Sequence, residues 1–151
     1  MADRTAFELE SRFPNHTIVK YNYVPCLRAA SAMAVGDAPV ALVITSTAST
    51  YELGGLGLPF YPIYLRGLSY LGLRDSHHAI AEFQKILNHR GVVINGALRP
   101  MAQLGIARAY VLSADHAKAI GAYQSFFSLW KDADQDTPLL KAARAEYTKL
   151  R

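Results

Sequence analysis

The side chains best suited to metal binding in this sequence are its histidines. His77 and His78 are adjacent, and His116 follows in a similar sequence context. Neighbouring residues on a helix point about 100° apart, so His77 and His78 cannot ligate one ion without further ligands. An HExxH pair is absent as well. We interpret these histidines as solvated residues in the first turns of helices, and we predict neither a metal site nor a cofactor.

A run of alternating carboxylates at Asp132, Asp134 and Asp136 has the spacing of the first half of a calcium-binding loop. An EF-hand loop needs glycine at its sixth position and glutamate at its twelfth. This chain has Thr137 and Ala143 at those positions. We therefore interpret the run as an acidic turn before a helix.

Catalytic side chains are not arranged in any recognisable pattern. Cys26 is the only cysteine, which excludes an internal disulfide, and its own predicted repeat unit (17–49) contains no histidine. A thiol in an apolar helix is usually part of the core. A GxSxG nucleophile elbow and paired catalytic carboxylates are also missing. We predict that the protein is not an enzyme.

The composition indicates one folded domain. Of the 151 residues, 51% are hydrophobic and only 19% are charged, a balance that can bury enough apolar surface to fold. The net charge of +4 is dispersed along the chain, which argues against a nucleic-acid partner. The uncharged stretches 38–51 and 53–65 fall short of the roughly 20 apolar residues that a membrane-spanning helix needs. With no signal peptide at the N-terminus, we expect a cytoplasmic protein without membrane insertion.

Three segments of the chain repeat one pattern, in which an aspartate is followed four residues later by an alanine. Another small residue stands twelve positions before each alanine, and the alanines are 38 and 40 residues apart. The matching positions are Ala29, Asp37 and Ala41, then Gly67, Asp75 and Ala79, then Ala107, Asp115 and Ala119. This period indicates an internal structural repeat.

Each repeat unit is predicted to be a pair of helices, because apolar residues recur at three- and four-residue steps on both sides of the aspartate. Each aspartate is expected to cap the second helix of its unit, and Pro25 is expected to kink the first helix of the first unit. The predicted helices span residues 3–12, 17–35, 38–48, 59–73, 76–89, 97–112, 116–131 and 138–150. The predicted core contains Gly67, Tyr70, Ala79, Phe83, Ala107, Tyr110, Ala119 and Tyr123.

The segments YLRGLSYLGLRDSHHAIAEF and LGIARAYVLSADHAKAIGAYQSFF resemble the tetratricopeptide repeat (TPR). In that family two antiparallel helices form each unit, and the units stack into a right-handed superhelix. The resemblance implies an all-α, TPR-like superhelix of antiparallel helix hairpins, in one domain that covers residues 1–151. Its units would span 17–49, 58–90 and 97–131, with a C-terminal capping helix at 137–150 and half of a further repeat at 3–12.

A closer likeness covers nearly the whole chain, from YELGG to PLLKAARAEYTKL. It looks like the C-terminal helical-repeat region of large bacterial proteins, chiefly acidobacterial serine/threonine kinases and some winged-helix regulators. A glycine-rich phosphate loop followed by a strand lysine, an HRD and a DFG are all absent, so kinase activity is not carried over. The resemblance implies a non-catalytic interaction or sensing region of a larger signalling protein.

In TPR arrays the first helices of the units line a groove that binds protein segments. Counting from the small residues predicts an apolar, tyrosine-rich lining of twelve side chains. They are Tyr23, Cys26, Ala30 and Met33 from the first unit, Tyr61, Tyr64, Leu68 and Leu71 from the second, and Met101, Leu104, Arg108 and Val111 from the third. A clamp for a C-terminal carboxylate would need several cations, and only Arg108 is available, so we predict no such clamp. We hypothesise that the groove binds a protein or peptide segment, or upstream domains of a parent chain. The alternative is a structural spacer or a homodimerisation unit without a peptide ligand.

Overall fold

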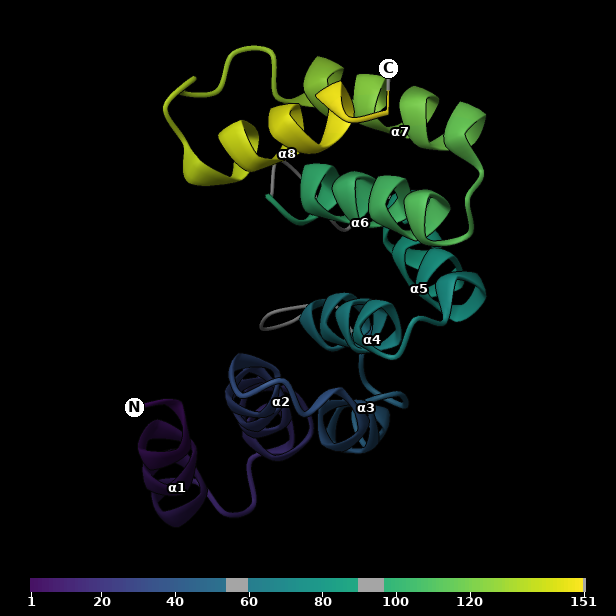
Figure 1. Ribbon diagram of the computed structural model, residues 1–151. Helices are drawn as coiled ribbons and strands as arrows, with labels where there is room; N and C mark the ends of the chain where they lie inside the picture. The colour runs from purple at the N-terminus through teal and green to yellow at the C-terminus, as the bar shows by residue number, and fades with distance from the viewer. Residues whose placement is uncertain (54–59, 90–96, 151) are drawn as a thin grey trace.

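A computed structural model of the protein shows a stack of helices (Figure 1). The structure describes residues 1–53, 60–89 and 97–150, and these residues form eight α-helices and no strand. The predicted all-α class is therefore confirmed. The helices are α1 (Ala2–Arg12), α2 (Val24–Ala34), α3 (Ala38–Ser46), α4 (Tyr61–Gly72), α5 (Ser76–Asn88), α6 (Leu98–Leu112), α7 (His116–Leu129) and α8 (Pro138–Thr148).

The helices pack in the order of the sequence. α2 and α3, α4 and α5, and α6 and α7 form three pairs, and a turn of three residues joins the members of each pair. α4 lies in the middle, since it contacts α2 and α6 as well as α3 and α5. α1 and α8 lie at opposite ends of the stack (Figure 1).

The second helix of each pair begins at an aspartate, as the sequence predicted. The carboxylates of Asp37, Asp75 and Asp115 accept hydrogen bonds of 3.1–3.2 Å from the backbone N–H three residues later. Each bond satisfies one of the amides that has no partner at a helix start. Apart from the helix predicted at 17–35, every predicted helix agrees with the structure to within two residues at each end.

The helix predicted at 17–35 contains an irregular turn. Val19–Tyr23 are π-helical (η1), and α2 begins directly after this turn. Pro25 has no N–H to donate to the carbonyl four residues before it, and a π-helical turn is one way to re-space the remaining hydrogen bonds. The irregularity expected at Pro25 therefore lies just before that proline.

The core is built from small residues on one helix that face aromatic residues on the next. Of the eight predicted core residues, Tyr70 and Tyr110 are only half-buried and pack at the edge of the core, and the other six are buried. The ring of Tyr70 stacks on His78 with 5.1 Å between centroids, and Lys118 Nζ lies 5.5 Å above the ring of Tyr110. Both tyrosines therefore reach toward the polar first turn of the following helix, which explains their partial exposure.

Phe83 of α5 lies between two glycines, Gly67 of α4 and Gly105 of α6. A Cβ atom built on either glycine would come within 2.5 Å of the Phe83 ring, closer than carbon atoms can approach. The Phe83 side chain is fully buried. The ring therefore packs directly on the backbones of both neighbouring helices, which alanine at either position would prevent.

A buried ion cluster joins the second helix pair to the segment that follows α3. Arg66 of α4 donates to Glu82 of α5 at 2.7 Å and 3.1 Å and to the Thr45 carbonyl at 3.2 Å. Its Nη1 also lies 2.7 Å from Glu52 Oε2, an ion pair without the angle of a directed hydrogen bond. Burial lowers the pKa of Arg66, but its two carboxylate partners outweigh this effect and raise it. Lys85 Nζ binds the other oxygen of Glu82 at 2.6 Å, so the cluster has no net charge.

The contact between Gly105 and Phe83 gives a first prediction. We expect Gly105→Ala to lower the free energy of unfolding by about 1–3 kcal/mol, because its methyl group overpacks the ring. Gly121→Ala is the matched control, since a Cβ there meets nothing within 4 Å, and it should stabilise the helix by up to about 1 kcal/mol. Urea unfolding followed by circular dichroism measures both changes, and equal effects of the two substitutions would contradict this packing.

The buried ion cluster gives a second prediction. We expect Arg66→Met to destabilise the protein by about 3–5 kcal/mol, because two buried carboxylates lose their shared cation. Adding Glu52→Gln and Glu82→Gln should recover much of this loss, since no buried charge then lacks a partner. The exposed Arg74→Met should change the stability by less than about 0.5 kcal/mol. If the triple variant were less stable than Arg66→Met in the same urea titration, the charge argument would fail.

Candidate functional site

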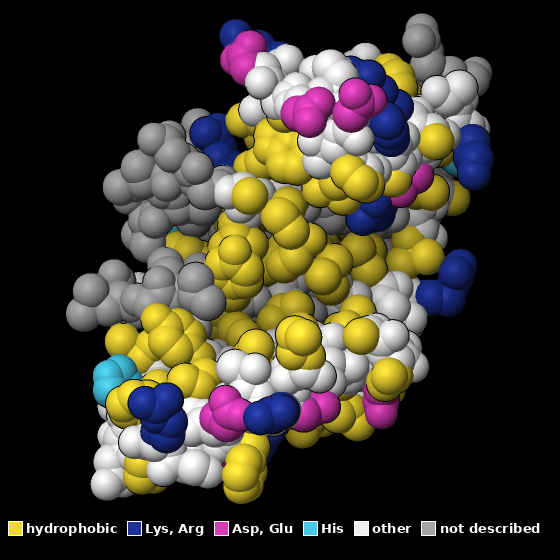
Figure 2. Space-filling view, turned by 90° about the vertical axis from the view of Figure 1, so that its left-hand side faces the viewer, with side chains coloured by type: hydrophobic (Ala, Val, Ile, Leu, Met, Phe, Trp, Pro, Cys, Tyr) yellow, Lys and Arg dark blue, Asp and Glu magenta, His cyan; other side chains and the backbone are white. Residues whose placement is uncertain are grey.

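One face of the molecule carries a hollow in which hydrophobic side chains gather. Figure 2 shows this face, which lies on the left of Figure 1. The hollow has a volume of about 530 Å³ and lies between α1, α2 and α4. We name it the apolar groove and define it by its lining residues. They are Leu9, Tyr23, Cys26, Leu27, Ala30, Tyr61, Tyr64 and Leu65.

The apolar groove brings together five of the predicted lining residues, Tyr23, Cys26, Ala30, Tyr61 and Tyr64. The prediction did not include Leu9, Leu27 and Leu65. Leu9 was missed because the prediction counted only the first helix of each repeat unit, whereas α1 precedes the first unit and still reaches the groove.

The two tyrosines that α4 contributes to the groove have different surroundings. Tyr64 is half-buried, and its ring lies 5.8 Å from that of Phe83, so the core supports it from behind. Burial raises the pKa of Tyr64, and the positive charge of Arg108 lowers it by a smaller amount. Tyr61 is 38% exposed. Tyr64 therefore forms a fixed wall of the groove, while Tyr61 offers its ring to the solvent.

Cys26 does not have the properties of a nucleophile. The residue is buried, and burial raises the pKa of its thiol to about 12. The thiolate, which is the reactive form, is therefore scarce at neutral pH. Cys26 serves the groove as a small apolar side chain.

The remaining predicted site residues lie outside the apolar groove. Leu104 is only 1% exposed and belongs to the same core cluster as Leu140 and Ala143 of α8. A side chain this deeply buried does not line an open groove, so the assignment of Leu104 to the groove was wrong. Leu68 and Leu71 are half-buried against the core. Met33 on α2 and Met101 on α6 are half-buried as well, and Val111 on α6 is 38% exposed. The groove therefore ends at α4, although the repeat pattern continues into α6.

Arg108 is occupied by an ion pair with the last helix. Its Nε and Nη2 donate to the two carboxylate oxygens of Glu146 in α8 at 3.0 Å and 2.8 Å, and the Tyr123 hydroxyl donates to the same carboxylate at 2.7 Å. Burial lowers the pKa of Arg108, but the bonds to Glu146 outweigh this effect and raise it. Because its charge is compensated, Arg108 ties α8 to the stack and does not act as a free cation beside the groove.

The histidines and carboxylates that suggested a metal site have other partners. His78 Nδ1 lies 2.7 Å from the Asp75 carboxylate that caps α5, and Asp134 accepts a hydrogen bond from the backbone of Asp136. Within the described part of the chain, His, Cys, Asp and Glu side chains form no group of three that could hold a metal ion. None of the helices in residues 1–53, 60–89 and 97–150 has the length and apolar character needed to cross a bilayer.

The contact between α8 and α6 predicts a pH dependence. Burial raises the pKa of Glu146, but the hydrogen bonds from Arg108 and Tyr123 outweigh burial and keep it below the ordinary value of 4.5. Its contribution to stability is thus complete above pH 4.5 and is lost as the pH falls through the lower folded-state pKa. We expect Glu146→Gln to be less stable than the wild type at neutral pH and this difference to shrink below pH 4.5.

Urea unfolding at a series of pH values measures this difference. Glu8→Gln is the control, because its pair with Arg4 is exposed at the surface and should contribute little at any pH. A destabilisation by Glu146→Gln that stays constant across the series would contradict the assigned role of the carboxylate.

Comparison with known proteins adds no family to this description. No protein-family model matches the chain, and no curated protein or solved structure is significantly similar to it.

Proposed function

We propose that the protein is a non-catalytic protein-binding module with a TPR-like right-handed superhelical arrangement of antiparallel helix hairpins. Three features support this proposal. The three helix pairs follow the sequence period, an aspartate caps the second helix of each pair, and small residues meet aromatic residues between neighbouring helices. In such arrays each unit contacts only its neighbours, which leaves an extended face for a partner.

The observation that carries the proposal is the uncharged lining of the apolar groove. All eight lining residues lack a charge, and three of them are tyrosines. Tyrosine supplies a large contact area with few rotatable bonds, and it is enriched among the residues that dominate binding energy. An apolar surface of this kind on a solvent-facing side is typical of an interaction site.

We propose a peptide segment with large apolar side chains as the occupant. The groove has a volume of about 530 Å³, which accommodates a few side chains that protrude from a peptide segment. A partner protein with a flat surface would leave this volume unfilled. The segment should carry no charge where it enters the groove, because an ion there would lose its hydration without gaining a partner. The segment belongs to a partner protein or to upstream domains of a larger signalling protein, the context that the resemblance implies.

A second candidate function is self-association, which a separate apolar patch favours. Phe7, Val35, Val40 and Val43 are 68%, 82%, 45% and 70% exposed. Phe7, Val35 and Val40 line a further hollow of about 620 Å³ between α1, α2 and α3. A second copy of the chain that stacked on this patch would remove these side chains from water.

A charge placed in the apolar groove tests the proposed function. Ala30 is an exposed residue of the groove, so Ala30→Glu should fold normally. We expect this variant to lose at least about 10-fold in affinity, or 1.4 kcal/mol, for apolar peptides selected from a random phage-displayed library on the wild-type protein. The exposed Ala81→Glu on α5 lies outside the groove and serves as the control.

Fluorescence anisotropy with one selected peptide gives the affinities, and light scattering across protein concentrations gives the mass. Equal affinity of the two variants for the peptide would contradict the groove proposal. A dimer that Val43→Glu dissociates, together with a library that yields no specific peptide, would instead favour self-association.

A further inference from the structure

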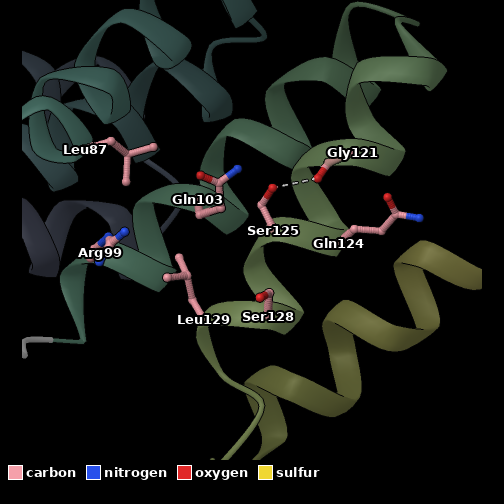
Figure 3. Close-up of a pocket in the computed structure, with 8 residues that line it drawn as sticks. All are labelled: Leu87, Arg99, Gln103, Gly121, Gln124, Ser125, Ser128 and Leu129. Carbon is pink, nitrogen blue, oxygen red and sulfur yellow. Dashed lines mark hydrogen bonds between the residues drawn. The ribbon is translucent and has the colours of Figure 1, made fainter.

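A third hollow lies between α5, α6 and α7, and unlike the apolar groove it is lined by charged and polar side chains as well as by leucines. It has a volume of about 520 Å³, within the range of small-molecule sites. Arg99 and Gln103 of α6 lie on one side, and Ser125 and Ser128 of α7 lie on the other (Figure 3). Leu87 of α5 and Leu129 of α7 add apolar contacts.

Arg99 brings an uncompensated positive charge to this pocket. The side chain is half-buried, and no carboxylate among residues 1–53, 60–89 and 97–150 lies within ion-pair distance of it. The stretches 54–59 and 90–96 contain no Asp or Glu in their sequence. By contrast, Arg66 and Arg108 bind carboxylates at 2.7–3.1 Å. Arginine presents five N–H donors in a planar fork that matches a carboxylate or a phosphate.

Neutral hydrogen-bond donors lie beside Arg99 on α6 and opposite it on α7. Gln103 Nε2 donates one hydrogen to the Ala122 carbonyl at 3.4 Å, which holds the amide beside α7 and leaves its second hydrogen available. Ser128 Oγ has no hydrogen-bond partner within the described residues. Gln124 points away toward α8 (Figure 3), where its Nε2 donates to the Tyr147 hydroxyl at 3.3 Å.

Gly121 provides an independent observation on the shape of the pocket. Glycine in the interior of a helix is less favourable than alanine. The backbone at Gly121 is helical, and a Cβ there would meet nothing within 4 Å, so neither conformation nor packing requires glycine. Gly67 and Gly105, in contrast, are required by Phe83. The missing side chain of Gly121 instead widens the pocket beside Ser125.

We propose that this pocket binds the carboxylate or phosphate group of a small anionic molecule. The proposal rests on the charge of Arg99, the neutral hydrogen-bond donors and the space that Gly121 leaves open. The Arg99 guanidinium pairs with the oxyanion, and Gln103 and Ser128 donate to its remaining oxygens. The leucines contact the apolar part of the molecule. This site is separate from the apolar groove, so the two can be tested independently.

Two-dimensional amide NMR tests the proposal with sodium phosphate and sodium acetate as separate probes, at constant ionic strength maintained with sodium chloride. We expect saturable shifts at the amides of Arg99, Gln103 and residues 121–128 with at least one probe, and the tighter probe identifies the chemical class. Arg99→Gln should weaken binding by at least about 10-fold, because glutamine keeps an amide donor but removes the charge that pairs with the anion.

Gly121→Leu keeps every charge but fills the pocket, so it should abolish the saturable shifts while circular dichroism shows a folded protein. Lys131→Ala removes an exposed cation outside the pocket and should leave binding unchanged. Shifts that increase linearly with anion concentration would overturn the proposal. Affinities that are the same in the wild type, Arg99→Gln and Gly121→Leu would overturn it as well.

Discussion

The contact of the Phe83 ring with the backbones of α4 and α6 is the constraint on which the rest of the structure depends. Gly67 and Gly105 leave room for the ring on its two sides, and an added Cβ on either would come within 2.5 Å of it. The distances between α4, α5 and α6 follow from this contact. Tyr64, whose ring lies 5.8 Å from that of Phe83, is held in the wall of the apolar groove by the same side chain. Core packing and the candidate binding surface are therefore linked through one aromatic residue.

The sequence predicts the helices and their starting points well, because those features are local. A capping aspartate acts within three residues, and helical periodicity is visible over a dozen residues. The ion cluster of Arg66 was not predicted, since it depends on Glu52, Glu82 and Arg66 meeting from three separate segments. The extent of the groove was not predicted either. Whether Leu104 faces solvent depends on which helices pack against α6, and the pattern of α6 alone carries no signal for those contacts.

The two candidate sites differ in whether a nearby arginine has a carboxylate partner. Arg108 beside the groove and Arg66 within the stack have carboxylate partners, so an uncharged partner segment meets no free cation in the groove. Arg99, which has no such partner in the described part of the chain, lies in a different pocket with amide and hydroxyl neighbours. An apolar segment and an anionic molecule would thus select different sites on one small stack. The two sites share no lining residue, so a ligand can bind to either one without the other.

The two ion clusters differ in their exposure to dissolved salt, so the middle of the helix stack and its C-terminal end should respond differently to ionic strength. The side chains of Arg66, Glu52 and Glu82 are 7%, 8% and 11% exposed, whereas those of Arg108 and Glu146 are 33% and 34% exposed. Ions in solution screen exposed pairs far more than buried ones. Rising ionic strength therefore weakens the attachment of α8 while the middle of the stack keeps its electrostatic contacts. The ion pair between α6 and α8 is therefore the salt-sensitive contact of the two, while the buried side chains of Leu140 and Ala143 still hold α8 in concentrated salt.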